Sequence, residues 1–225
     1  MDFYLTLKSD FEKNQDPACA EKMAAYMRNL FPFYGLPTPK RKALYQSFLK
    51  AEKKQKQVNW ELLDQSYADE HREFQYFVID YLWVMRRLLT LDDVPHIEKY
   101  LRTKAWWDSI DGFNKIIGHL VSNDSKGREL ILNWSTDPDF WIRRIAIDHQ
   151  LGRKEQTDTE LLEKILLNNL GSTEFFINKA IGWSLRDYSK TNPDWVRNFL
   201  KVHKENMHSL SIREASKYIE ENFQG

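Results

Sequence analysis

The stretch TKAWWDSIDGF, residues 103–113, places two adjacent tryptophans beside two carboxylates. In a helix, Trp107 and Asp111 are four residues apart and share one face. An apolar core would accept the ring but not the carboxylate, and a solvated face would accept the reverse. Two interpretations are therefore open: Asp111 is held beside the ring for chemistry, or it is a surface acid that pairs with Lys115 at i+4.

Two neighbours of this pair have simpler interpretations. Trp106 shares the adjacent helix face with Ile110, so we expect its ring in the core. Asp108 lies three residues before Asp111 and could form a two-carboxylate hydrolase with it. Two acids on one helix rarely lie on either side of a scissile bond, however, so we expect Asp108 to hydrogen-bond locally or to support Asp111.

Other catalytic chemistries lack their motifs. The six histidines show no HExxH or other ligand spacing, and there is no glycine-rich phosphate loop, GxSxG elbow or dinucleotide fingerprint. The single cysteine, Cys19, has no base near it in the sequence. We therefore expect neither a metal ion nor a cofactor.

The composition indicates a folded protein of a reducing compartment. Hydrophobic residues make up 42% of the 225 and charged residues 29%, an ordinary balance for a globular chain. One cysteine excludes an intramolecular disulfide. Charges interrupt the apolar residues of the first segment, MDFYLTLKSDFEK, and no apolar run of membrane length follows. We expect a soluble, intracellular protein located in the cytoplasm.

Helical signals run through almost the whole chain, and no segment shows the period-two alternation of a strand. Five helix starts are indicated by capping residues, four of them followed by proline. The capping residues are Asp16, Thr38, Asn59, Asp137 and Asn192. The segment LFPFYGLPTPK, residues 30–40, is predicted to be an ordered connector between two helices.

A small residue recurs at a nearly constant period in helices that align with one another. The aligned residues, separated by 34, 34, 34 and 35 positions, are Val78, Gly112, Ala146, Ala180 and Ala215. The sequence between each two consecutive aligned helices has room for a second helix, which is typical of stacked helical hairpins. The tetratricopeptide signature is absent, so HEAT-like repeats fit better. We predict one all-α domain over residues 1–225, a curved solenoid with N-terminal helices in 1–57 and repeats in 58–225.

The formal net charge is zero, so any basic surface must be local. The repeat helices carry eight cations that could converge in a groove wide enough for a nucleic acid. They are Lys104, Arg143, Arg144, Lys179, Arg186, Lys190, Arg213 and Lys217. The alternative is that these residues lie on solvated helix faces, as most charge runs do.

Several strings in the chain are specific. The two most informative are KAWWDSID (104–111) and FFINKAIGWSLRDYSKTNPD (175–194), and they are supported by MAAYMRNLFPFYGLPTPKRK (23–42), HREFQ (71–75) and DFWIRRIAI (139–147). In this order and spacing, over nearly the whole chain, they resemble the AlkD family of HEAT-like repeat DNA glycosylases. The resemblance implies an enzyme that excises positively charged alkylated purines, such as N3-methyladenine and N7-methylguanine, from duplex DNA. It also implies that the base is not drawn into a pocket.

The resemblance further implies which residues act, wherever a string matches. The catalytic positions are Asp111, Trp107 and Trp183. The DNA-binding positions are Tyr26, Arg144 and Arg186, with Lys179 and Lys190 as further candidates. Taken singly, either tryptophan is more often a core residue, and the tyrosine could simply contact the other N-terminal helices.

The resemblance gives the pair of Trp107 and Asp111 a chemical meaning. A methylated purine is already positively charged and leaves without protonation, so the second carboxylate of most glycoside hydrolases becomes unnecessary. What remains is a deoxyribose oxocarbenium cation, which one fixed carboxylate beside aromatic rings can stabilise. We therefore expect Asp111 to be ionised at neutral pH, without a raised pKa, and to hold the attacking water.

The expected partner is double-stranded DNA that contains alkylated purines, bound by a monomer that does not associate with membranes. The same solenoid could instead bind distorted DNA without cutting it. It could also be a protein-interaction scaffold, which is the usual work of helical solenoids. A scaffold would have no converging cations in its groove and would be indifferent to DNA.

Overall fold

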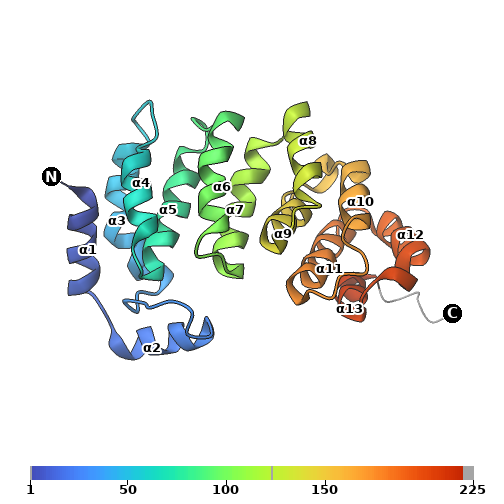
Figure 1. The fold of residues 1–225 in the computed structure, drawn as a ribbon, viewed down its shortest axis with the longest axis horizontal. Coiled ribbons are helices and arrows are strands. Elements are labelled where there is room, and N and C mark those ends of the chain that lie inside the picture. The colour runs from blue at the N-terminus through green and yellow to red at the C-terminus, as the bar shows by residue number, and fades with distance from the viewer. Residues whose placement is uncertain (1, 123, 220–225) are drawn as a thin grey trace. The chain divides into compact units, whose positions relative to one another are not determined.

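Helices form the regular structure of residues 2–122 and 124–219, the part of the chain that the computed structural model describes (Figure 1). These residues contain no strand, so the predicted all-α class is confirmed. The chain divides into two compact units, Met1–Thr90 and Leu91–Gly225. The organisation as one domain stays a prediction. Among the described helices, none has the length and apolar character needed to cross a membrane.

Five helices build the first unit around an aromatic core. They are α1 (Phe3–Lys13), α2 (Pro17–Tyr26), α3 (Thr38–Glu52), α4 (Trp60–Ala68) and α5 (Arg72–Met85). The rings of Phe11, Tyr45, Phe74 and Phe77 are fully buried and meet edge-on or tilted. Aromatic pairs in these geometries stabilise a fold beyond the area that they bury. This cluster therefore holds α1, α3 and α5 together.

One buried carboxylate orders the connector between α2 and α3. Glu73 accepts hydrogen bonds from the backbone N–H groups of Tyr34, Gly35 and Leu36, at 3.1, 3.0 and 3.1 Å. Gly35 has a φ of +83°, and a Cβ at this position would collide with the carbonyl oxygen of Asp16. The ordered connector predicted from the sequence is confirmed.

The second unit is a stack of helical hairpins. Its helices are α6 (Val94–Arg102), α7 (Trp107–Leu120), α8 (Ser125–Trp134), α9 (Phe140–Asp148), α10 (Thr159–Leu167), α11 (Phe175–Ser189), α12 (Pro193–His203) and α13 (Ser209–Ala215). Helix α7 packs on α9, α9 on α11, and α11 on α13, so every second helix forms one layer. This alternation is what the repeat predicts.

The residues aligned by the repeat lie in α5, α7, α9, α11 and α13, and they are Val78, Gly112, Ala146, Ala180 and Ala215. The tightest contacts of the layer, however, involve two other glycines. A Cβ on Gly182 of α11 would lie 2.5 Å from the Cβ of Glu214 on α13, and one on Gly118 of α7 would collide with the carbonyl oxygen of His149. Both glycines allow neighbouring helices of the layer to approach closely.

The helix starts were predicted with mixed success. Three predicted caps are confirmed by side chains that accept a backbone N–H, namely Asp16, Asn59 and Asn192. Two predicted caps are wrong. Thr38 is itself the first residue of α3, which has no side-chain cap. Helix α9 is capped by Asp139, because Asp137 instead accepts hydrogen bonds from the backbone of Asp139 and from the side chain of Arg102.

Candidate active site

A bidentate ion pair joins α7 to α9. Nε of Arg144 donates to Oδ1 of Asp111 at 2.9 Å, and its Nη2 donates to Oδ2 at 3.1 Å. The arginine side chain is 4% exposed, whereas the aspartate side chain is 23% exposed. Asp111 therefore pairs with Arg144 of the next repeat rather than with Lys115 of its own helix. Both carboxylate oxygens are held by the protein, and part of the side chain remains exposed.

The same guanidinium reaches α11. Its Nη1 donates to the carbonyl oxygen of Phe176 at 2.8 Å, and its Cζ lies 5.9 Å from the centre of the Trp183 ring. Asp111 and Phe176 are 33 and 32 positions from Arg144, close to one repeat in each direction. Stacked repeats bring residues at such spacings together. Three successive helices of the layer thus meet at one arginine.

Burial raises the pKa of Asp111 above its usual value, and the charge and hydrogen bonds of Arg144 oppose the rise. The expectation that this pKa is not raised is therefore wrong in direction, because the sequence does not show how deeply α7 is covered. Both carboxylate oxygens nevertheless accept hydrogen bonds from a guanidinium, which is the geometry of an ionised carboxylate.

A second carboxylate lies behind the arginine. Asp148 follows Arg144 by one turn of α9, its side chain is fully buried, and its Oδ2 lies 3.8 Å from Nη2. Among the described residues, neither of its oxygens has a hydrogen-bond partner. Burial raises the pKa of Asp148 well above its usual value, with Arg144 opposing. This residue was not predicted to act, although the i+4 spacing in RRIAID was visible.

An aromatic cluster surrounds the start of α7. The Trp106 ring meets Trp141 at 5.7 Å and Phe176 at 5.2 Å between ring centres, both edge-on. Trp106 is half-buried rather than fully buried, while Ile110 on the same face is completely covered. The ring belongs to a packed cluster, as expected, but at the end of a helix. The cluster supports the backbone of Phe176, to which Arg144 is bound.

The remaining residues of the tryptophan string lie on the first turn of α7. Trp107 is its first residue and is half-buried, one turn before Asp111. Asp108 is also half-buried, and its charge contributes to the raised pKa of Asp111. The helix continues without a break through Gly112 to Leu120. Trp107 and Asp111 therefore share a helix face, as the spacing predicts.

A second charged cluster joins α11 to α13. Glu214, whose side chain is 5% exposed, accepts a hydrogen bond from Lys179 at 2.9 Å, from Arg186 at 2.5 Å and from Lys217 at 2.9 Å. The hydrogen bonds from Lys179 and Lys217 lower the pKa of Glu214 to about 2. Three cations surround one carboxylate, so the cluster keeps a positive excess. Glu214 was not predicted from the sequence, although it lies 35 positions, about one repeat, after Lys179.

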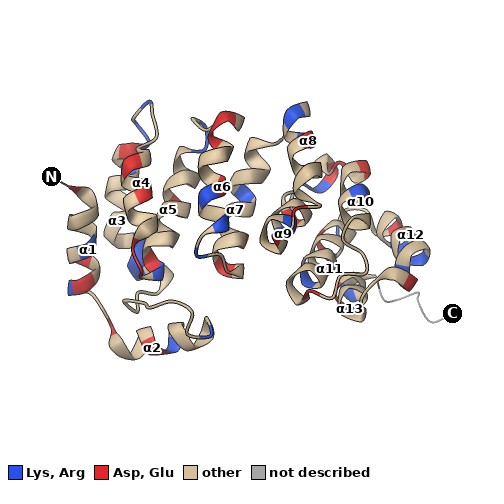
Figure 2. Ribbon diagram, in the orientation of Figure 1, with Lys and Arg blue, Asp and Glu red and all other residues tan. Residues whose placement is uncertain are grey.

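The eight candidate cations do not form one continuous group; some of them gather in small clusters. Acidic and basic residues are mixed along the helices (Figure 2). Arg143 donates to the carbonyl oxygen of Asp137 at 2.8 Å. The exposed Lys190 lies 3.8 Å from Asp187 and 5.3 Å from the ring centre of Tyr218. Of the eight candidate cations, the three on Glu214 and the buried Arg144 therefore form organised groups.

Tyr26 belongs to the first unit. It is the last residue of α2, and 71% of it is exposed. Its predicted contact with DNA stays a prediction.

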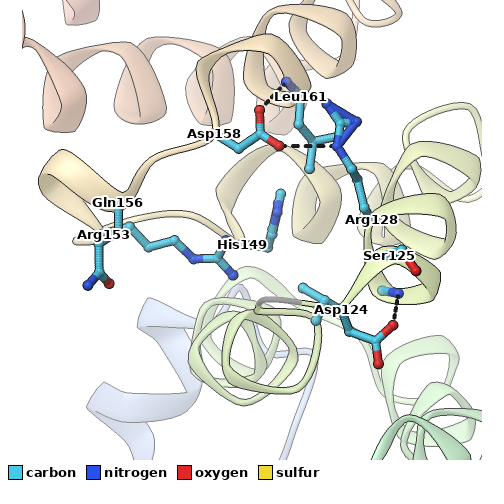
Figure 3. Close-up of a pocket in the computed structure, with 10 residues that line it drawn as sticks. Asp124, Ser125, Arg128, His149, Arg153, Gln156, Asp158 and Leu161 are labelled. Atoms are coloured by element: carbon cyan, nitrogen blue, oxygen red, sulfur yellow. Dashed lines mark hydrogen bonds and ion pairs between the residues drawn. The ribbon is translucent and has the colours of Figure 1, made fainter.

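A pocket of about 280 Å³ lies among α8, α9 and α10 (Figure 3), and its lining residues include none of those predicted to act. Arg128 donates to Asp158 at 3.1 Å, and Arg153 donates to the carbonyl oxygen of Gly118 at 2.6 Å. His149 bonds the carbonyl oxygen of Ala146, and burial lowers its pKa to about 3, so its ring is neutral. The charged groups of this pocket hold helices together.

Comparisons with known proteins agree with this fold. Residues 7–219 match the model of a family described as DNA alkylation repair enzyme. The structure of a predicted DNA alkylation repair enzyme from Enterococcus faecalis is similar, with 37% identity, a TM-score of 0.84, and coverage of 92% of this chain and 97% of that one. AlkD2 from Streptococcus mutans is 17% identical, with a TM-score of 0.61 and coverage of 78% and 88%, and supports the fold alone. No curated protein matches the chain. The resemblance inferred from the sequence strings is confirmed.

Proposed function

The chain belongs to the family of DNA alkylation repair enzymes, and on this premise we propose that it is a DNA glycosylase. The proposed reaction is hydrolysis of the N-glycosidic bond of cationic alkylated purines, such as N3-methyladenine and N7-methylguanine, in duplex DNA. It leaves an abasic site, as the first step of base excision repair. The observation that carries the proposal is a single carboxylate, Asp111, which Arg144 orients and which stays partly exposed.

Asp111 is proposed to stabilise the positive charge of the sugar. An alkylated purine leaves as a neutral base, so no acid is needed to protonate it, and the barrier is that of forming an oxocarbenium cation. A carboxylate offers about four lone-pair directions, and Arg144 uses two of them. The others remain for the cation and for the attacking water. Preorganised groups of this kind contribute about 3–4 kcal/mol to lowering a barrier.

Two aromatic rings are proposed to supplement the carboxylate. Trp107 lies one turn before Asp111, and Trp183 lies on α11 beside the guanidinium of Arg144. The face of an indole ring attracts positive charge by about 0.5–2 kcal/mol. Rings on either side of the sugar would therefore favour the oxocarbenium cation over the neutral nucleotide, without drawing the base into a pocket.

Contacts to the DNA backbone are proposed for Lys179, Arg186 and Lys190 on α11, and for Tyr26 on α2. Lys179 and Arg186 keep N–H donors beyond their bonds to Glu214, since a guanidinium has five and an ammonium three. Arg144 was also predicted to bind phosphate, but its side chain is buried and three of its donors are in use. We propose that Arg144 acts mainly by positioning Asp111. The substrate is duplex DNA, bound by a monomer.

The proposal is tested by release of N7-methylguanine from methylated duplex DNA under single-turnover conditions. Asp111→Asn is expected to lower the rate constant by about 100-fold or more, since one preorganised electrostatic group is removed, while DNA affinity stays near that of the wild type. Asp194→Asn is the matched control, because Asp194 is an exposed acid on α12 paired locally with Arg197. It should release base at the wild-type rate.

The other two functions predict different results. A binder of distorted DNA would retain affinity for the methylated duplex but release neither N3- nor N7-methylated bases above the spontaneous rate. A protein-interaction scaffold would show neither base release nor salt-dependent binding of DNA. Either result with the wild-type protein would overturn the glycosylase proposal.

A further inference from the structure

Asp148 is an anomaly in the described part of the chain. Its side chain has no exposed area, and neither carboxylate oxygen has a hydrogen-bond partner among the described residues. Burial of an unsatisfied carboxylate is costly, so proteins normally pair such groups or place them where they have a function. The proposed reaction, as described so far, makes no use of this residue.

Within the described residues, the surroundings of Asp148 contain one cation at ion-pair distance and two further acids. Nη2 of Arg144, at 3.8 Å, is the cation, but it is hydrogen-bonded to Asp111 instead. The charges of Asp111 and Asp187 also act on Asp148, and both disfavour its ionised form. Asp187 has its own partners, the backbone N–H of Gly152 at 2.7 Å and Lys190 at 3.8 Å. One guanidinium therefore lies between two carboxylates and is bonded to only one of them.

A short movement would exchange these partners. Hydrogen bonds between a guanidinium and a carboxylate are about 2.7–2.9 Å long, so Nη2 needs to move about 1 Å to bind Asp148. Asp148 follows Arg144 by one helical turn, so both residues stay on α9 during the movement. The bond from Nη1 to the carbonyl oxygen of Phe176 provides a fixed point about which the guanidinium can turn.

We propose that Asp148 is a positioning residue, a second carboxylate that receives Arg144 when Asp111 turns to the cationic sugar. The proposal rests on the proposed function, because it needs a cation beside Asp111. Before the substrate binds, Arg144 neutralises Asp111. A cation at the sugar repels Arg144 and competes with it for the same carboxylate. Asp148 then binds Nη2, while Nε still holds Oδ1 and positions Asp111, so that Oδ2 is released to act on the substrate.

The test compares binding to two duplexes that contain abasic-site analogues. One analogue has a sugar ring with a protonated nitrogen, which represents the cationic sugar, and the other is the neutral tetrahydrofuran ring. The measured quantity is the ratio of the two dissociation constants, which needs no turnover. In Asp148→Asn the preference of the wild type for the cationic analogue is expected to fall about tenfold, the size of one missing interaction with a charged group.

Asp187→Asn is the matched control, since it removes a nearby negative charge without removing a partner available to Arg144. It should keep the wild-type ratio. Asp148→Ala should show the same decrease in the preference for the cationic analogue. It replaces Asp148→Asn in the test if the asparagine variant does not fold. Wild-type melting temperatures in the variants would show that the fold is retained.

Three results would overturn the proposal. The first is an unchanged ratio in both Asp148 variants. The second is an equal loss of affinity for the two analogues, which is what a purely structural role would give. The third is a wild-type protein without any preference for the cationic analogue, and this result would also remove the cation chemistry of the proposed function. A wild-type preference that persists in the Asp148 variants would overturn the role of Asp148 alone.

Discussion

Arg144 is the residue on which the candidate site depends. It is buried, it holds both oxygens of Asp111, it binds the backbone of α11, and it lies at ion-pair distance from Asp148. Burial raises the pKa of both carboxylates, and the guanidinium opposes both shifts. Without it, the fold would contain two carboxylates with no compensating charge.

Arg144→Gln is therefore expected to lower the free energy of unfolding by about 3–5 kcal/mol at neutral pH, the range for breaking a buried ion pair. The loss should depend on pH. In the variant, the pKa of each aspartate rises further above its unfolded value, so the folded state binds more protons and is favoured as the pH falls. The deficit relative to the wild type should shrink toward pH 4 in chemical denaturation. Arg143→Gln, which removes hydrogen bonds to the carbonyl oxygens of Asp137 and Pro138, is the control. A deficit that does not change with pH would contradict this account.

At the scale of elements, α11 and α13 are joined by a close approach and by a charge cluster at the same place. Gly182 has no side chain, so the backbone of α13 reaches α11 and brings Glu214 between the cations of α11. The hydrogen bonds from Lys179 and Lys217 favour the ionised form of Glu214 and lower its pKa to about 2. The absence of a side chain at Gly182 thus explains both the close contact of the two helices and the orientation of the proposed phosphate-binding residues.

Glu214→Gln is expected to lower the free energy of unfolding by about 1–2 kcal/mol at neutral pH, less than for a fully buried pair because the cations are partly exposed. Since the folded pKa is depressed, this contribution is present above the usual value of 4.5 and is lost as the pH falls toward 2. Denaturation of both proteins between these pH values measures the difference. Glu160→Gln removes an exposed acid paired with Lys164 and should change stability little. A constant difference across this range would exclude the carboxylate charge as its source.

At the scale of the whole molecule, the repeat period was the informative signal for the fold. It predicted stacked helical hairpins, and the structure shows the consequence that residues about 33 positions apart, such as Asp111 and Arg144, meet. The resemblance located Asp111, but not the depth at which it lies. Asp148 and Glu214 were not found, because a buried acid in a helix has the same sequence pattern as a solvated one. The i+4 spacing of Arg144 and Asp148 was visible but does not show burial, and the partners of Glu214 on α11 lie on another repeat, which a pattern read along one helix does not include.

The zero net charge of the chain has a consequence for binding. Without an overall positive field, affinity for DNA must come from local phosphate contacts, each of which releases counterions. We expect the affinity to fall linearly with salt on logarithmic axes. Arg186→Gln or Lys179→Gln should reduce the slope by about 0.9 for each phosphate that the variant no longer neutralises.

Lys201→Gln is the control for this experiment, since Lys201 is exposed on α12 and has no proposed role in binding. It should leave the slope unchanged. The DNA phosphates must also compete with the carboxylate of Glu214 for Lys179 and Arg186, because Glu214 binds both cations in the free protein. If the slope stays the same in Arg186→Gln and in Lys179→Gln, these residues remain bound to Glu214 in the complex. Their role would then be to join α11 to α13, and the phosphate contacts would have to come from other cations of the chain.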